Sequence, residues 1–325
     1  MDEKRPILAV VDDGAEDLSA IERATWLADG YNAPIEIFSA IFDPYIAGER
    51  LFDSEDLIAA KTKRLADQRT LLEEIAVPLR SDGYQVEVSV VWDEPVFESV
   101  VRQALRSNPI CVVRNNHFHN ALQRGLFSND DWNLIRTCPA PLWITRRGKS
   151  RSETLRIAAA VDPMHTHDKP ALLDQTILMH AQSLADQTEG EMHVVHCYDA
   201  TPVIAAMAAG TMSPYAVDRQ SVTEQVLAEH KDALEAITAD LARDTTEVHL
   251  VAGNPRDVLP AFVVDNAVDV LVVGAVSRGF IKRTFIGNTA EKVLDRTPCD
   301  LLIVKPKDFA TPVKADSRHR FAPVP

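Results

Sequence analysis

The sequence lacks any apolar run of membrane-spanning length and any excess of basic residues. A transmembrane helix needs about 18 or more consecutive apolar residues. A net charge of −14 over 325 residues argues against a protein that grips nucleic-acid phosphates, because such binding needs a basic face. The polar start, Met1–Pro6, runs into a strand-like segment without an apolar signal core. These absences predict a cytoplasmic protein that binds neither a membrane nor nucleic acid.

Cysteine is scarce, and its placement excludes the usual structural metal motifs. No two cysteines have the spacing of paired metal ligands, and each lies in or beside an apolar, strand-like segment. Reduced, buried thiols of this kind are typical of a cytosolic protein. The four cysteines are Cys111, Cys138, Cys197 and Cys299.

Catalytic motifs are missing as well. The sequence contains no Gly-x-Ser-x-Gly elbow and no Gly-x-x-x-x-Gly-Lys-Ser/Thr loop. Its many carboxylates include no marked catalytic pair, so an ATPase or a nucleotidyl transferase would have no visible base or nucleophile. We therefore expect a non-catalytic protein, or at most one with weak ATP hydrolysis.

The chain does contain two copies of one unit, each about 150 residues long. A repeat of this length indicates a domain duplication, because solenoid repeats run about 20–50 residues. The expected domains are residues 1–149 and 150–308, followed by a disordered polar tail at 309–325. The matched segments are Ile7–Asp12 with Ile157–Asp162, Ser89–Pro95 with His249–Pro255, and Thr137–Thr145 with Arg296–Val304.

Each copy alternates strand-like and helical patterns. Short β-branched runs suit parallel strands buried on both faces, and the longer periodic segments between them suit helices. This alternation predicts an α/β fold with a doubly wound, mostly parallel sheet, whose ligand crevice lies outside the carboxyl ends of the strands. The expected strands are Ile7–Val11, Ile35–Ala40, Val86–Val91, Ile110–Val113 and Leu142–Thr145, then Ile157–Val161, Met192–Cys197, Glu247–Val251, Val268–Val273 and Leu301–Val304.

Three helices have clear apolar patterns. The first has leucine or isoleucine at every seventh position and a stop at Gly83; the second has a compact apolar stripe; the third is long, at Val222–Ala242. The apolar positions expected to face the core are Ile58, Leu65, Leu72 and Leu79 in the first helix, and Phe97, Val100, Val101 and Leu105 in the second.

A glycine-containing loop follows the fourth strand of the second copy. Gly274 allows the chain to turn off the strand, and Gly287, Asn288 and Thr289 lie where a helix begins. Free backbone N–H groups and the helix dipole converge at such a point, which makes it an anion site suited to phosphate. The same residues also fit a simple turn and helix cap. Basic side chains within the loop are Arg278, Lys282 and Arg283.

Taken together, several segments of the chain resemble the universal stress protein family, in its tandem two-domain form. They are Asp162 after the first strand, the Gly253–Pro255 turn, the Gly274 strand end, the nine-residue spacer before Gly287, and Cys299–Val304. The resemblance covers nearly all of residues 5–305. It implies two copies of a five-stranded parallel α/β domain, Rossmann-like and adenine-nucleotide alpha-hydrolase-like, related by a pseudo-two-fold axis. It also implies an internal pseudo-dimer, with the chain as a monomer or a dimer of tandem chains.

The resemblance implies a nucleotide site in the second copy. Members that bind ATP hold adenine near the aspartate after the first strand and near the second strand, here Asp162 and Cys197. They hold ribose and phosphates on a Gly-x-x-Gly, nine-residue, Gly-Ser/Thr/Asn loop, matched by Gly274, Gly287 and Asn288, with Thr289 following. Ser277 replaces the second glycine, and its Cβ narrows the approach of a phosphate to the backbone. Gly279 can re-register the loop. The implied cofactor is ATP or another adenine nucleotide with Mg²⁺, and otherwise none.

The first copy departs from the motif at all three glycine positions. Its fourth strand runs into Arg114 and two asparagines, and Ser128 stands where the second copy has Gly287. Asp12 remains after the first strand, although a strand-end aspartate often only caps a helix. We therefore interpret the first copy as structural, without the family's ATP-binding mode.

Other features leave alternatives open. His165 and His167 lie near the expected crevice as candidate metal or phosphate contacts, or as solvated loop residues. His193 and His196 would point to opposite faces of a strand and so not share a metal. The apolar segment Pro202–Pro214 suits a lid, a binding surface or a short packed helix. The rival to nucleotide binding is an interaction or small-ligand module of the same fold.

Overall fold

The fold is described from a computed structural model. It covers residues 4–14, 17–46, 55–116, 127–146, 154–164, 172–210, 217–241, 246–275 and 288–315, with the side chains of 288–290 left out. Within these ranges no helix is long and apolar enough to cross a membrane. The described chain divides into two compact units. Unit 1 comprises Met1–Lys149, Leu301–Ile303 and Asp308–Pro325, and unit 2 comprises Ser150–Asp300 and Val304–Lys307.

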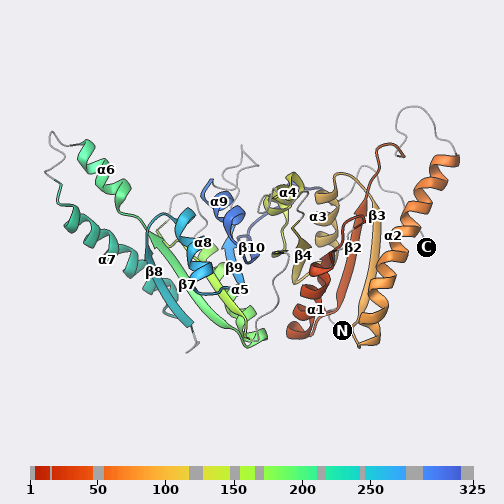
Figure 1. The fold of residues 1–325 in the computed structure, drawn as a ribbon, viewed down its shortest axis with the longest axis horizontal. Helices are drawn as coiled ribbons and strands as arrows, with labels where there is room; N and C mark the ends of the chain where they lie inside the picture. The colour runs from red at the N-terminus through yellow and green to blue at the C-terminus, as the bar shows by residue number, and fades with distance from the viewer. Residues whose placement is uncertain are drawn as a thin grey trace. The chain divides into compact units, whose positions relative to one another are not determined.

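Unit 1 alternates strands and helices along the chain (Figure 1). Its strands lie in the order β3-β2-β1-β4-β5, and every neighbouring pair is parallel. The predicted doubly wound sheet is confirmed. The elements are β1 (Ile7–Val10), α1 (Ser19–Tyr31), β2 (Ile35–Ile41), α2 (Glu55–Ser81), β3 (Val86–Trp92), α3 (Val96–Ser107), β4 (Cys111–Asn115), α4 (Asn129–Thr137) and β5 (Leu142–Thr145).

Unit 2 repeats the arrangement. Its strands lie in the order β9-β6-β7-β8, again parallel, so β8 is the strand furthest from β9. Helices α6 and α7 lie beside each other at the β8 end of this order (Figure 1). The elements are β6 (Arg156–Ala160), α5 (Leu173–Thr188), β7 (Glu191–Tyr198), α6 (Thr201–Ala209), α7 (Arg219–Thr238), β8 (Thr246–Ala252), α8 (Pro255–Asp265), β9 (Val270–Gly274), α9 (Asn288–Arg296) and β10 (Asp300–Val304).

The middle of β10 belongs to unit 1. Leu301, Leu302 and Ile303 pair antiparallel with β5, opposite Ile144, Trp143 and Leu142. The resemblance noted above implies that Leu142–Thr145 and Leu301–Val304 lie side by side, because single-domain members pair through the strand after the last helix and an unpaired edge strand is a liability; the pairing is confirmed. The flanking residues belong to unit 2, where the Val304 carbonyl accepts a hydrogen bond from the Ala275 N–H at 3.0 Å.

The core of unit 1 lies on both sides of its central strands. All residues of β1, β2, β4 and β5 are buried, as expected for parallel strands covered on both faces. Trp143 of β5 is fully buried, and its ring meets that of Trp26 from α1 edge to face at 5.8 Å. This sheet holds the carboxyl ends of β1 and β4 at a fixed position.

Two helix faces differ from the sequence expectation. In α2, Leu65 and Leu72 are buried, but Ile58 is 58% exposed, because it lies in the first turn of the helix and the buried part of α2 begins only at Lys61. In α3, Leu105 is 40% exposed and the helix instead buries Arg102. The guanidinium of Arg102 is ion-paired with Asp93 and Glu98, which makes its burial tolerable.

Most of the apolar segment Pro202–Pro214 belongs to α6, a helix without a buried residue. Val203 and Met207 are 43% and 47% exposed, and the helix contacts α7. Residues 211–214 of the segment lie outside the described ranges. Of the expected tail, residues 309–315 are described, and the Lys314 carbonyl accepts a hydrogen bond from Arg102 Nε at 3.3 Å.

The four cysteines are free thiols. Cys111, Cys138 and Cys299 are buried as predicted, whereas Cys197 is half-buried. Burial raises the pKa of Cys111 far above its ordinary range.

Candidate functional site

The candidate site of unit 2 lies where three neighbouring strands end. Strand β6 has β7 on one side and β9 on the other, so it is the point at which the strand order reverses. Asp162 follows β6, Cys197 lies near the end of β7, and Gly274 closes β9. Crevices at such switch points are the usual ligand sites of doubly wound sheets. The fold therefore brings together three of the residues predicted from the sequence.

Asp162 is held by the helix that follows it. Its backbone N–H donates to Oδ1 of Asp174 on α5 at 3.0 Å, and Asp174 is itself buried. The two residues thus tie the end of β6 to the first turn of α5. The side chain of Asp162 is half-buried, so its carboxylate is accessible from the strand ends.

The carboxylate of Asp162 affects the pKa of the Cys197 thiol. The pKa of its thiol is raised to about 12, mainly by burial and further by the negative charge of Asp162. The thiol is therefore protonated at neutral pH. It offers a small, weakly polar surface and does not act as a nucleophile.

Gly274 is required by packing as well as by its place before the loop. A Cβ at this position would lie 2.7 Å from Cδ2 and 2.8 Å from Cγ of Leu173, the first residue of α5. Its φ does not fall in the left-handed region. Gly274 therefore has a packing role that the sequence did not indicate, because its missing side chain makes room for Leu173; its role as a turn residue stays a prediction.

The loop predicted to hold phosphate lies largely outside the described residues. Ser277, Arg278, Gly279 and Gly287 fall in the range 276–287, and the side chains of Asn288 and Thr289 are not described. The backbone of α9 begins at Asn288, so the prediction that a helix starts there is confirmed. His165 and His167 also lie outside the described ranges.

A histidine pair anchors α7 at the same strand ends. His196 of β7 is buried; its Nδ1 lies 3.1 Å from the Val161 carbonyl and its Nε2 lies 2.7 Å from Nδ1 of His230. The two rings stack at 4.9 Å. Burial lowers the pKa of His196, which keeps its ring neutral. Sequence reasoning missed His230, because only its spacing on a helix could have indicated it.

In unit 1 the matching corner holds a buried cation. Arg114 of β4 is 3% exposed; its Nη2 lies 3.3 Å from Oδ1 of Asp12 and its Nε lies 3.5 Å from Oδ1 of Asp131. Burial by itself lowers the pKa of Arg114, but the carboxylates of Asp12 and Asp131 raise it by more. Asp12, the counterpart of Asp162, is therefore neutralised within the protein. Asn115, at the place of Gly274, accepts a hydrogen bond from Thr145 Oγ1 at 2.8 Å.

The helix start of unit 1 is closed by its own side chains. Ser128 Oγ accepts from the Asp131 N–H at 3.1 Å, and the Asp131 carboxylate accepts from the Ser128 N–H at 3.0 Å. This reciprocal capping box satisfies backbone donors that an anion would otherwise use, and Asp131 adds a negative charge. The position matching Gly287 is thus occupied by a cap.

Comparisons with known proteins agree with the duplicated fold. The model described as "Universal stress protein family" matches residues 4–146 and again 156–305. Universal stress protein E of Escherichia coli strain K12 is 27% identical over 319 residues, which cover 96% of this chain and 98% of that protein.

Solved structures show the same fold. A putative universal stress protein from Pseudomonas aeruginosa UCBPP-PA14 has a TM-score of 0.69 and 23% identity, with 94% of each chain covered. A universal stress protein from Archaeoglobus fulgidus has a TM-score of 0.61 and 16% identity over 93% of this chain and 99% of that one.

Proposed function

This chain belongs to the universal stress protein family, and we propose that it is a cytoplasmic stress-response protein that binds an adenine nucleotide in unit 2 alone. The nucleotide is a regulatory ligand, and the protein is non-catalytic or hydrolyses ATP weakly. The observation that carries this proposal is the convergence of Asp162, Cys197 and Gly274 at three neighbouring strand ends, with α9 beginning at Asn288.

The proposed contacts follow from the chemistry of each group. Adenine stacks against the ends of β6 and β7, where Asp162 offers a hydrogen-bond acceptor and the Cys197 thiol offers a weakly polar surface. The phosphates and their Mg²⁺ occupy the loop from Ser277 to Gly287, with the N-terminus of α9 as the positive end of a helix dipole. Arg278, Gly279, Asn288 and Thr289 complete this proposed set.

The asymmetry between the units supports a single site. A nucleotide at Asp12 would have to displace Arg114 from its carboxylate and compete with the Ser128 cap for backbone N–H groups. Removing one partner of a buried charge pair is strongly unfavourable. Unit 1 is therefore proposed to be structural.

The test is isothermal titration of the full chain with Mg–ATP. Gly287→Val places a β-branched side chain at the phosphate position and should abolish binding. Ser277→Gly restores the family's second glycine and should tighten binding roughly ten- to hundredfold, if one pair of backbone contacts is gained at about 1–3 kcal/mol. Ser128→Ala in unit 1 is the matched control and should leave the affinity unchanged.

The second candidate is a nucleotide-independent interaction or small-ligand module, favoured by Ser277 at a glycine position. It predicts no heat from the wild type, Ser277→Gly or Gly287→Val at millimolar ATP. That outcome would exclude the nucleotide site and leave the crevice for another ligand.

A further inference from the structure

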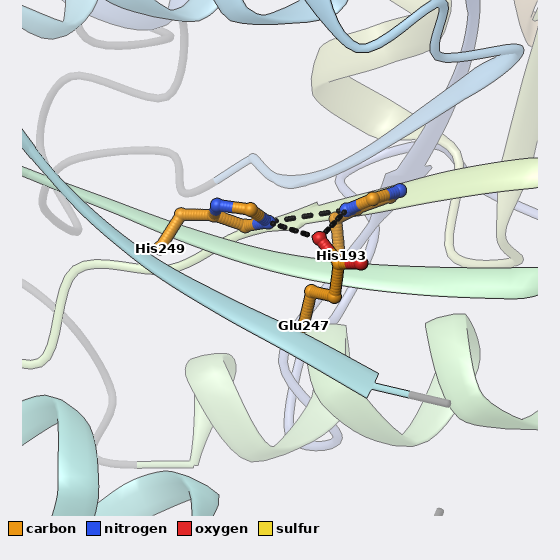
Figure 2. A group of neighbouring side chains, drawn as sticks. All are labelled: His193, Glu247 and His249. Atoms are coloured by element: carbon orange, nitrogen blue, oxygen red, sulfur yellow. Dashed lines mark hydrogen bonds and ion pairs between the residues drawn. The ribbon is translucent and has the colours of Figure 1, made fainter. Parts of the chain in front are cut away.

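A second cluster of ligand-type side chains lies on the β7–β8 pair of unit 2. His193 stands on β7 directly opposite Glu247 of β8, and His249 lies two residues further along β8, on the same face as Glu247. Figure 2 shows the two rings and the carboxylate pointing toward one another from the two strands. His196 makes its contacts with Val161 and His230 instead, so the expectation that His193 and His196 do not share a metal agrees with these contacts.

The three groups converge at distances suited to a small metal ion. His193 Nδ1 lies 3.1 Å from His249 Nε2, and each of these nitrogens lies 3.6 Å from Oε2 of Glu247. A tetrahedral ion with metal–ligand bonds of about 2.0–2.1 Å separates its ligand atoms by about 3.3–3.4 Å. Only shifts of a few tenths of an ångström separate this arrangement from three corners of a tetrahedron.

The contacts within the cluster also suit a metal. Within the cluster, the close approach of two imidazole nitrogens and a carboxylate requires either a shared proton or a cation. With an ion on Nδ1 of His193 the ring proton lies on Nε2, which is buried and has no hydrogen-bond partner in the described part of the chain, so this atom does not itself point to the metal.

Packing holds the two rings while leaving one side open. Phe262 of α8 meets the His249 ring at 4.9 Å and the His193 ring at 6.2 Å, edge to face in both cases. His193 is 7% exposed, whereas the Glu247 side chain is 69% exposed. A metal here would have three protein ligands and a fourth position facing solvent, available to water.

The matching positions in unit 1 argue against a general feature of the fold. With Ile7 matched to Ile157, the strand registers place Glu36, Glu87 and Ser89 where unit 2 has His193, Glu247 and His249. Unit 1 therefore has no imidazole in this place. Both histidines are specific to unit 2.

We propose that His193, Glu247 and His249 bind a divalent late transition metal, with Zn²⁺ as the best fit. Imidazole nitrogen with one carboxylate suits Zn²⁺, whereas Mg²⁺ and Ca²⁺ need more oxygen ligands than this cluster offers. The ion links β8 to β7 and stabilises the β8 end of the strand order.

The experiment uses the full chain after treatment with a chelator. Zn²⁺ is titrated in competition with a chromophoric chelator, and Co²⁺ is added separately because its visible spectrum reports tetrahedral nitrogen and oxygen ligation. We expect one Zn²⁺ per chain and a tetrahedral Co²⁺ spectrum, with no binding of Mg²⁺. The Zn²⁺-loaded protein should also unfold at a higher temperature than the metal-free protein.

Two variants test the ligands without disturbing the core. His249→Gln and Glu247→Gln change half-exposed and exposed side chains, so circular dichroism should show an unchanged fold. Each should weaken Zn²⁺ binding by at least about tenfold. Removal of a residue that only supports a metal ligand already weakens binding by about ten- to hundredfold, so loss of a ligand itself should cost no less. His230→Gln, and a His165→Gln/His167→Gln pair, are the controls and should leave the affinity unchanged.

Absence of Zn²⁺ binding by the wild type would overturn the proposal. So would unchanged binding in either Glu247→Gln or His249→Gln, because the site needs all three ligands. Loss of binding in the His165/His167 pair alone would assign the metal to that loop and equally overturn the proposal. None of these results depends on whether unit 2 binds a nucleotide.

Discussion

In unit 1, the fourth strand ends in an arginine and an asparagine, and the arginine lies beside the aspartate that follows the first strand. The fourth strand of unit 2 ends in a valine and a glycine at the matching places. Arg114 lies against Asp12 and Asp131 in unit 1. In unit 2 the matching places hold Val273 and Gly274, and the Asp162 side chain is half-buried. The same corner of the same fold therefore holds a buried arginine on the fourth strand of one unit and small, uncharged residues on that strand of the other.

The two units differ at this corner in more than one residue. Where unit 2 has Gly274 and Gly287, unit 1 has a strand end beside a buried counter-ion and a self-capped helix start. Each of these features stabilises the unit and each opposes an anionic ligand. Four changes should reveal how strongly the comparison depends on single residues, from the largest expected effect to the smallest.

Arg114→Met should cause the largest loss. It leaves Asp12 and the buried Asp131 without their cation, and breaking a buried ion pair in this way costs about 3–5 kcal/mol. Urea unfolding should show a lower midpoint with an unchanged slope. The exposed Arg64–Asp13 pair supplies the control, because Arg64→Ala should cost no more than about 1 kcal/mol. Equal effects of the two substitutions would contradict the role given to Arg114.

Gly274→Ala should come next. The added Cβ would press on Leu173, and overpacking of this kind costs about 1–3 kcal/mol. The double variant with Leu173→Ala should recover part of the loss in a double-mutant cycle of thermal stability. Additive effects of the two substitutions would show that the glycine is not required by Leu173.

Ser128→Ala should cost about 1 kcal/mol, the usual value of a lost helix cap. Hydrogen exchange of the α4 amides should locate the loss in unit 1. Thr70→Ala is a suitable control, because the Thr70 hydroxyl donates to the Ala66 carbonyl on the exposed face of α2. If exchange in α4 stays unchanged, the capping box does not stabilise the start of this helix.

The smallest effect should be a pH dependence confined to unit 2. The pKa of His196 is lowered below its ordinary value of about 6.5 by burial, so the unfolded chain binds the proton more readily. The stability of unit 2 should therefore fall as the pH drops below about 6.5, and the loss should be smaller in His196→Asn. In unit 1 the position that matches His196 is Ser39, whose hydroxyl oxygen accepts a neutral hydrogen bond from Gln68 at 3.0 Å. Amide protection factors, which correct for the intrinsic pH dependence of exchange, are compared between the units at pH 7.5 and 5.5, and an equal loss of protection in both units would exclude His196 as its source.

Much of the fold follows from the sequence because buried parallel strands leave a plain signal. Runs such as Ile35–Ala40 and Leu301–Val304 are short, largely apolar and rich in β-branched residues, whereas the pairing of β10 with β5 was implied by the family resemblance. The opposite faces of His193 and His196 follow from the period of a strand. Helix faces were harder to predict, as Ile58 shows, because neighbouring elements decide how far each end of a helix is covered.

The site could be predicted only in part. Asp162, Cys197 and Gly274 follow from the strand ends, but the reason for Gly274 depends on Leu173, which comes about 100 residues earlier in the chain. Arg114 reads as the first residue of a polar loop, and nothing local indicates that it completes a strand and is buried between two carboxylates. The convergence of His193 with Glu247 and His249 likewise depends on strand register, which the sequence does not specify for β8.

The burial of the cysteines has a practical consequence for labelling. Maleimides and peroxides react with the thiolate, and the raised pKa values of Cys111 and Cys197 leave almost none of it at neutral pH. Cys138 and Cys299 are shielded by burial. A cysteine introduced at the exposed Met207 of α6 would therefore be the first to accept a fluorophore, with all four native cysteines left in place.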